Sequence, residues 1–193
     1  MEKPILATNI DGLLIKHSAF IEPHKYWFER AIRQTGDENL RKWIGADPYF
    51  PGVNEAMKKL MPNATKEEQT TQARTWYQQD VIKYIQKHPE VIIRSIEKKL
   101  RNLKRSYKII LLTSNTQDYI NKIIKISGFE GIYDDIIASQ TSKEPSKEEL
   151  LNQLIEKHGK PKYYLTGKQE PKLTEKLAKL EIKVLEPKDI DFI

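Results

Sequence analysis

The strongest constraint on the fold is an apolar stretch near the start of the chain, Ile5–Leu14, which reads ILATNIDGLL. It shows no helical period and contains a glycine, which predicts a buried strand that runs into a sharp turn. Asn9 and Asp11 lie at the expected end of this strand. Residues two apart in a strand point to the same face, so we expect these two side chains to converge on one ligand. In an open α/β sheet, ligands bind at the carboxyl ends of the strands.

The second half of the chain alternates short apolar runs with amphipathic helical patterns. Such alternation is typical of right-handed βαβ units, in which helices cover both faces of a parallel sheet. The further strands are expected at 107–113, 136–138, 162–166 and 182–185. The helices are expected at 90–104, 116–127, 146–157 and 174–180. Thr116 is expected to cap the second of these helices and Gly128 to end it, and Ser146 and Glu149 have the capping-box spacing at the start of the third. The predicted fold class is therefore α/β, a three-layer Rossmann-like parallel sheet.

The segment between residues 16 and 88 has helical patterns and no convincing strand. Pro23 is expected in the first turn of one helix, which ends at Gly36. Thr65 and Glu68 have the capping-box spacing that starts a long helix. Between these two helices, the Gly and Pro content of 45–52 predicts a loop, and a short helix is expected at 53–61. The predicted organisation is an α/β core of residues 1–15 and 89–193 with an all-helical cap insertion, residues 16–88.

Composition narrows the class of protein. A chain of 193 residues can bury the core of one domain and a smaller insertion. It contains no cysteine, which excludes a disulfide framework and thiolate chemistry. No apolar run approaches about 18 residues, and the start lacks the features of a signal peptide. The expectation is a soluble cytoplasmic protein with no membrane partner.

The formal net charge of +6 favours anionic partners such as phosphates, nucleotides or nucleic acid. The basic residues are densest between Lys98 and Lys108. A solvated outer face of a helix, with cations near its C-terminus, explains this cluster more simply than a nucleic-acid surface does. We therefore expect a small phosphorylated molecule or phosphate as the partner, and not nucleic acid.

Three stretches together carry a family resemblance: Asn9–Gly12, Thr113–Asn115 and the run GFEGIYDDIIAS at 128–139. In their order, spacing and strand-end placement they resemble the motifs of the haloacid dehalogenase-like (HAD) superfamily. The resemblance extends from about Pro4 to the last strand and includes the inserted helical cap. It implies a HAD-like fold and phosphatase-type hydrolysis of a small phosphorylated compound, with Mg²⁺ as the family's cofactor.

The first motif of that family reads Asp-x-Asp-Gly. Its first Asp attacks phosphorus to form an aspartyl-phosphate, and its second Asp is the general acid and base, whose backbone carbonyl helps to hold Mg²⁺. Here Asn9 takes the place of the nucleophile, while Asp11 and Gly12 match, Gly12 being expected beside the phosphate. An amide nitrogen is no nucleophile at neutral pH, so the covalent step is expected to fail.

The second motif is a strand-end Thr or Ser that binds the transferring phosphate, and Thr113 matches it. Ser114, Asn115 and the N-terminal amides of the following helix are expected to add donors. Without the resemblance, Thr113 reads as an ordinary strand-end turn residue. The third motif is a lysine that neutralises the phosphate. Lys143 fits a Lys-Pro-rich version and is preferred, whereas Lys147 fits the version in which the lysine opens the helix.

The fourth motif should follow a strand with Gly-Asp and a further acid. This chain has Gly167 and then Lys168, with Lys172 at the position of the later acid and Glu170 nearby at the wrong offset. Mg²⁺ needs oxygen ligands, which lysine does not supply. We therefore expect no metal site and no cofactor. Instead, we expect Lys168 to pair with Asp11 and to help hold phosphate.

The functional prediction is a catalytically impaired HAD-like protein that retains at most an anion-binding or phosphate-binding pocket. The alternatives are an active phosphohydrolase with atypical motifs, or an engineered Asn9 variant of one. The motif residues are expected to meet in one cleft at the carboxyl ends of the strands, under the cap.

Overall fold

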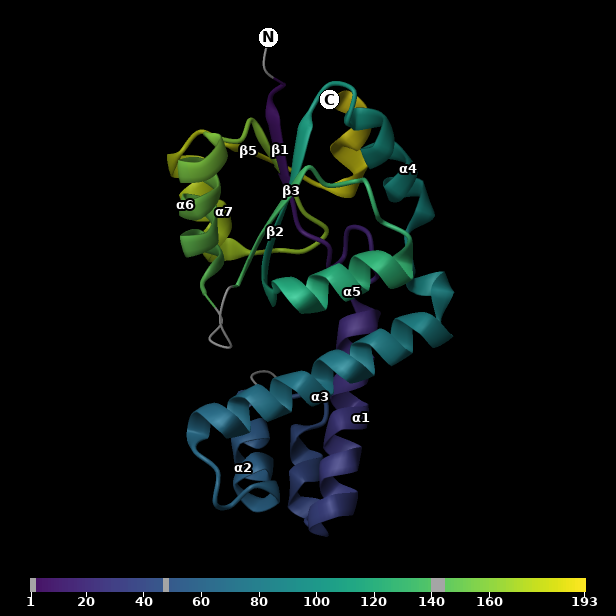
Figure 1. Ribbon diagram of the computed structural model, residues 1–193, viewed down its shortest axis with the longest axis vertical. Helices are drawn as coiled ribbons and strands as arrows, with labels where there is room; N and C mark the ends of the chain where they lie inside the picture. Colours follow the sequence, from purple (N-terminus) through teal and green to yellow (C-terminus); the bar gives the residue numbers. More distant parts are fainter. Residues whose placement is uncertain (1–2, 47–48, 140–144) are drawn as a thin grey trace. The chain divides into compact units, whose positions relative to one another are not determined.

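The computed structural model describes residues 3–46, 49–139 and 145–193 (Figure 1). Its contacts divide the chain into two compact units. The α/β unit comprises Met1–Lys16 and Glu90–Ile193, and the helical unit comprises His17–Pro89. The two segments of the α/β unit meet where Ile15 pairs with Ile92 in an isolated bridge.

The α/β unit is built on one parallel sheet of five strands, in the order β3-β2-β1-β4-β5 (Figure 1). The strands are β1 (Ile5–Thr8), β2 (Lys108–Thr116), β3 (Asp135–Ser139), β4 (Tyr163–Leu165) and β5 (Lys183–Leu185). Every neighbouring pair in the sheet is parallel. The predicted α/β class is therefore confirmed.

In the described part of the α/β unit, the sheet is covered by α4 (Arg94–Leu103), α5 (Gln117–Ser127), α6 (Lys147–His158) and α7 (Pro171–Lys179). The helices α6 and α7 lie on one face and α4 and α5 on the other (Figure 1). Side chains of β1, β2 and β4 pack with leucines of α6 and α7 into one core. Its members are Ile5, Ala7, Ile110, Leu112, Ile137, Leu150, Leu151, Leu154, Tyr164, Leu173, Leu177 and Ile182.

The helical unit consists of α1 (Ser18–Thr35), α2 (Phe50–Leu60) and α3 (Lys66–Lys87), with a 3₁₀ helix at Glu38–Trp43. Its described residues contain no strand. The predicted capping box is present, because the Thr65 hydroxyl accepts from the Glu68 amide and the Glu68 carboxylate accepts from the Thr65 amide. The unit has a core of its own: Trp27, Phe28, Ala31, Ile32, Leu40, Ala56, Met57 and Ala73.

Several element boundaries differ from those predicted. Pro23 lies well inside α1 and not in its first turn. The helix α2 begins at Phe50 and α7 at Pro171, each with a proline in the first turn. Proline suits that position because its fixed φ is helical and the amide hydrogen there needs no partner. Thr116 stands at the N-cap of α5, but its side chain makes no capping hydrogen bond.

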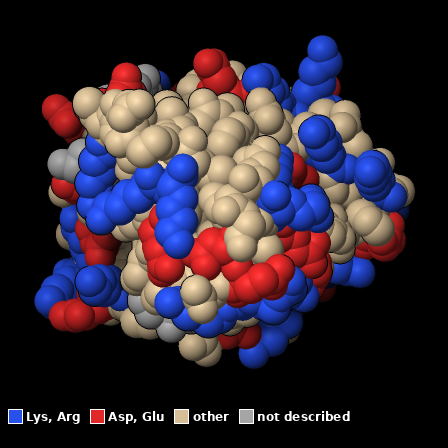
Figure 2. All heavy atoms as spheres, turned by 90° about the horizontal axis from the view of Figure 1, so that it is seen from below, with Lys and Arg blue, Asp and Glu red and all other residues tan. Residues whose placement is uncertain are grey.

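The basic residues between Lys98 and Lys108 make contacts within the α/β unit. Arg101 donates to the carbonyls of Gly128 and Glu130, and Lys99 pairs with Asp191. Carbonyl oxygens at the C-terminal end of α5 thus accept hydrogen bonds from Arg101. The helix dipole favours a cation at this end. On the face in Figure 2, acidic side chains lie among the basic ones. None of the described helices has the length and apolar character needed to cross a membrane.

Candidate active site

The first and fourth motifs meet at the carboxyl edge of the sheet. Thr8 at the end of β1 is in register with Leu111 of β2 and Leu165 of β4, so the turns after these strands reach the same edge. There, Gly12 and Gly167 touch backbone to backbone. A Cβ added at Gly12, whose φ is +73°, would lie 2.5 Å from the Gly167 carbonyl oxygen. Glycine at both positions is what allows the two turns to approach so closely.

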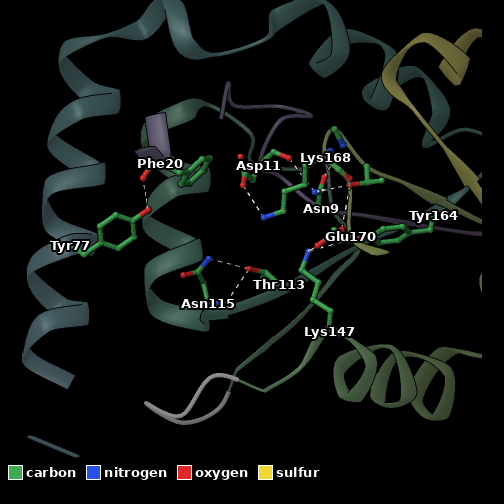
Figure 3. Close-up of polar contacts among 12 residues, drawn as sticks. Asn9, Asp11, Phe20, Tyr77, Thr113, Asn115, Lys147, Tyr164, Lys168 and Glu170 are labelled. Atoms are coloured by element: carbon green, nitrogen blue, oxygen red, sulfur yellow. Dashed lines mark hydrogen bonds and ion pairs between the residues drawn. The ribbon is translucent and has the colours of Figure 1, made fainter. Parts of the chain in front are cut away.

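Asn9 is buried between these two turns, with 2% of its surface exposed. Its Nδ2 donates to the Asp11 backbone carbonyl at 3.1 Å and to Thr166 Oγ1 at 2.9 Å (Figure 3). Its Oδ1 accepts from the Gly167 amide at 3.4 Å. The Asn9 side chain is therefore engaged within the protein and connects the first motif to the fourth.

Lys168 faces Asp11, with Nζ 3.0 Å from Oδ2 (Figure 3). The predicted pairing of these two residues is confirmed. The Lys168 side chain is 38% exposed and that of Asp11 is 17% exposed. A pair this accessible to water contributes less than about 1 kcal/mol to stability. The pair matters for the chemistry of the site, because it places an ammonium group where the family pattern has an acid.

A second, more buried pair lies beside the first. Lys147 Nζ is 2.7 Å from Glu170 Oε1, and the Tyr164 hydroxyl donates to Glu170 Oε2 at 2.7 Å (Figure 3). The side chains of Lys147 and Glu170 are 19% and 11% exposed. Burial lowers the pKa of Lys147, while the charges of Glu170 and Asp11 oppose that shift and the charge of Lys168 adds to it. The four charged groups therefore form one electrostatic cluster with no net charge.

Lys147 is held in this cluster by the start of α6. Ser146 caps the helix in the predicted capping box, with its hydroxyl accepting from the Glu149 amide and its own amide donating to the Glu149 carboxylate. The box fixes the first turn of α6 and so fixes the place from which Lys147 extends. Lys143, the preferred candidate for the third motif, lies outside the described residues.

Thr113 lies near the end of β2, next to this cluster in Figure 3. Its Oγ1 accepts from the Asn115 backbone amide at 3.2 Å and from Asn115 Nδ2 at 3.4 Å. No acceptor for its hydroxyl hydrogen is found among the described residues, so that hydrogen is available to a ligand. Ser114 lies between Thr113 and Asn115 and is half-buried.

Two predicted contributors take other roles. The Gly12 amide donates to the Ile15 carbonyl at 2.8 Å, so Gly12 forms the turn and supplies no amide to an anion. The Asn115 amide is likewise taken by Thr113. Lys172, at the position of the family's later acid, is an exposed residue of α7.

The residues at the metal position do not fit Mg²⁺. Lys168 supplies no oxygen ligand, and its ammonium lies 3.0 Å from the Asp11 carboxylate, where it would repel a dication. In the described part of the chain, no three His, Cys, Asp or Glu side chains are grouped so that they could hold a metal ion.

The sequence interpretation missed three residues of this site: Tyr164, Thr166 and Glu170. Thr166 binds Asn9 and also donates to the Lys168 carbonyl at 3.0 Å. One signal was available, because Tyr164 and Thr166 are two apart along a strand and must point to the same face. Two hydroxyls on one face at a strand end indicate a polar site beside them. Glu170 is not among the residues predicted for the site, because its offset does not match the family's spacing.

The loop that carries Lys168 also borders a cavity of about 520 Å³. This cavity lies beyond the ends of β4 and β5. Its lining residues are Thr166, Gly167, Lys168, Gln169, Glu170, Pro171, Thr174, Val184, Glu186 and Pro187. Asn9, Asp11 and Thr113 are not among them, so the cavity and the motif residues share only the loop.

A comparison with known protein families identifies the family to which this chain belongs. The family model described as haloacid dehalogenase-like hydrolase matches residues 9–164. The chain therefore belongs to the haloacid dehalogenase-like hydrolase family, as the motifs indicated. A search of curated proteins found no match.

Solved structures of this family share the fold at low sequence identity. A haloacid dehalogenase-like family protein from Streptococcus pneumoniae is 16% identical, with a TM-score of 0.58 over 95% of this chain and 83% of that one. A candidate phosphatase from Clostridium difficile is 14% identical, with a TM-score of 0.61 over 95% and 84%. A candidate β-phosphoglucomutase from Thermotoga maritima is 16% identical, with a TM-score of 0.56 over 97% and 96%.

Proposed function

We propose that this protein binds a small phosphorylated compound at the HAD site and does not hydrolyse it by the family's Mg²⁺-dependent route. The observation that carries the proposal is the contact between Lys168 and Asp11. The ammonium supplies positive charge at the point where the family pattern calls for a metal ligand. It therefore stands in for part of the dication's charge without its Lewis acidity.

Asn9 supports the same proposal from the side of the nucleophile. Its amide nitrogen has no nucleophilic lone pair, and its oxygen carries no full negative charge. Both ends of the amide are also engaged, with Thr166 and Asp11 at Nδ2 and Gly167 at Oδ1. Attack on phosphorus would require a different atom, and we assign none.

The groups that would bind the phosphate are Thr113, Lys168 and the start of α5. The Thr113 hydroxyl has a hydrogen to donate, and Lys168 is accessible to a ligand. The first amides of α5 carry no side-chain cap and point along the helix dipole, which favours an anion. Asp11, Glu170 and Asp118, which lies in the first turn of α5, oppose a dianion, so we expect weak affinity, in the millimolar range.

Turnover on a panel of phosphate esters with Mg²⁺, together with calorimetry of phosphate binding, tests this proposal. We expect no turnover above background and weak phosphate binding that Thr113→Val abolishes. Thr75→Val is the matched control, because Thr75 is an exposed residue of α3 whose hydroxyl bonds within its own helix. Hydrolysis of any phosphomonoester that EDTA abolishes would overturn the proposal. If phosphate does not bind at millimolar concentration, the proposed binding of a phosphorylated compound at this site is wrong.

Hydrolysis is the second candidate function, and family membership together with the retained Asp11 favours it. In that case the chain is an active phosphohydrolase with atypical motifs or an Asn9 variant of one. The Asn9→Asp variant shows whether Asn9 alone limits hydrolysis or whether Lys168 blocks it as well. If Asn9 alone limits the reaction, this single change produces Mg²⁺-dependent turnover. If Lys168 also blocks the metal, as we propose, Asn9→Asp stays inactive.

A further inference from the structure

The helical unit contains an aromatic and basic cavity that the proposed function does not use. It measures about 400 Å³ and is lined by Tyr26 of α1 and by Asp80, Lys83, Tyr84, Lys87 and His88 at the end of α3. The helices α1 and α3 pack against each other, with α3 crossing α1 in Figure 1. All of these residues belong to one compact unit, so the cavity is complete within it.

The aromatic residues of the cavity form a continuous row. The rings of Tyr84 and His88 are stacked, with centroids 4.3 Å apart, and the Tyr26 ring is 6.3 Å from that of Tyr84. Tyr26 is 48% exposed, which is unusual for so large a side chain beside other rings. Its exposed ring therefore offers a face on which a planar ligand can stack.

The charges around these rings are not balanced. Asp80 is bound by Arg30 at 2.6 Å, and Lys25 is bound by Glu22 at 2.7 Å, so both pairs are neutral. Lys83 and Lys87 are exposed, one turn apart on α3, and have no acidic partner within 4.0 Å among the described residues. The helix dipole would favour Lys87 at this end of α3, but it does not explain three aromatic rings beside two uncompensated ammonium groups.

Lys25 lies next to Tyr26 on α1 and outside the lining of the cavity. The hydrogen bond from Lys25 to Glu22 raises the pKa of Lys25, and Tyr26 and Tyr84 contribute in the same direction. Glu22 thus offsets the charge of Lys25, and among the described residues around the cavity the ammonium groups without an acidic partner are those of Lys83 and Lys87. A ligand with a phosphate would find ammonium groups at the rim of the cavity and aromatic faces within it.

We propose that this cavity binds a small molecule that carries both an aromatic ring and a phosphate, of the mononucleotide class. The ring stacks on Tyr26 and Tyr84, and the phosphate is held by Lys83 and Lys87. The volume suits a ligand of this size and not a polymer, since small-molecule pockets begin at about 300 Å³. The inference concerns the helical unit and does not rest on the function proposed for the HAD site.

Calorimetry of the full chain with AMP, adenosine and ribose 5-phosphate tests the inference. AMP is expected to bind at least about tenfold more tightly than adenosine or ribose 5-phosphate, because only AMP uses both the rings and the lysines. The variant Lys83→Ala/Lys87→Ala should weaken AMP binding about tenfold and leave adenosine binding unchanged. Tyr26→Ala should weaken AMP and adenosine alike.

Matched variants localise the site. Lys58→Ala/Lys66→Ala removes two exposed lysines elsewhere in the helical unit and should leave AMP binding unchanged. AMP binding that is lost in Lys168→Ala and kept in Lys83→Ala/Lys87→Ala would place the ligand at the HAD site and overturn the inference. Circular dichroism checks that each variant is folded. Three results would also overturn the inference: no binding of millimolar AMP, unchanged binding in Lys83→Ala/Lys87→Ala, or a single-stranded oligonucleotide that binds far more tightly than AMP.

Discussion

Two ion pairs with different burial occupy the candidate active site. Lys168 and Asp11 are 38% and 17% exposed, whereas Lys147 and Glu170 are 19% and 11% exposed. Water screens the first pair, so its effect on stability is small. The second pair has lost much of its hydration, and each partner depends on the other to remain charged. Single substitutions should therefore have very different costs at these two places.

Lys147→Met is expected to lower the free energy of unfolding by about 3 kcal/mol, because it leaves the Glu170 carboxylate buried and unpaired. Lys168→Met is the matched control and should cost less than about 1 kcal/mol. Adding Glu170→Gln to Lys147→Met should recover part of the loss, since the unpaired charge is then removed. Urea unfolding followed by circular dichroism measures all three. Equal losses for Lys147→Met and Lys168→Met would contradict this interpretation.

The residues of the site were predictable to the extent that the family motifs fix their positions. Asn9, Asp11 and Lys168 were identified from spacing, and the contact between Asp11 and Lys168 followed from their charges. Glu170 could not be found in this way, because its role depends on meeting Lys147 from another helix and Tyr164 from a strand. Contacts between elements distant in sequence leave no local pattern.

Secondary structure elements were predicted best where a local rule determines them. The capping boxes at Thr65 and Ser146 and the left-handed glycines Gly36 and Gly128 mark helix ends that the structure confirms. The starts of α2 and α7 were placed too late because of a proline. Pro171 was not used as the start of α7, although a first-turn proline is a start signal as much as a break.

The outer edge of the sheet is stabilised by contacts between β3 and the end of α6. Asp135 Oδ2 is 2.7 Å from Lys157 Nζ and 2.5 Å from His158 Nε2, and His158 Nδ1 is 3.1 Å from Lys108 Nζ. Burial opposes ionisation of Asp135, but the hydrogen bonds from Lys157 and His158 outweigh it and lower its pKa to about 2. The carboxylate is therefore stabilised in the folded state.

The resulting stabilisation is expected to depend on pH. A folded-state pKa below the unfolded value adds stability above the unfolded pKa, and the gain is lost as pH falls toward the folded pKa. Asp135→Asn should thus lower the free energy of unfolding by up to about 2 kcal/mol at pH 7, and the difference should shrink between about pH 4 and pH 2. Unfolding curves across this range test it. A difference that does not change with pH would show that Asp135 acts through packing alone.

At the scale of the whole molecule, the chain has the α/β fold of its family and a helical insertion between Ile15 and Ile92. Strand and helix periodicity predicted the fold, because a parallel sheet requires its strands to alternate with covering helices. The ligand was not predictable. Fold and family are compatible with many chemistries, and the choice among them is made by a few side chains.

The central claim is that Lys168 occupies the place of the metal, and titration of the protein with Mg²⁺ by calorimetry tests it most directly. The unmodified protein should release no heat of binding at millimolar Mg²⁺. Lys168→Asp should gain measurable affinity, and Asn9→Asp/Lys168→Asp should bind more tightly, because each change adds a carboxylate to the site. Micromolar binding of Mg²⁺ to the unmodified protein, unaffected by Lys168→Asp, would contradict the account.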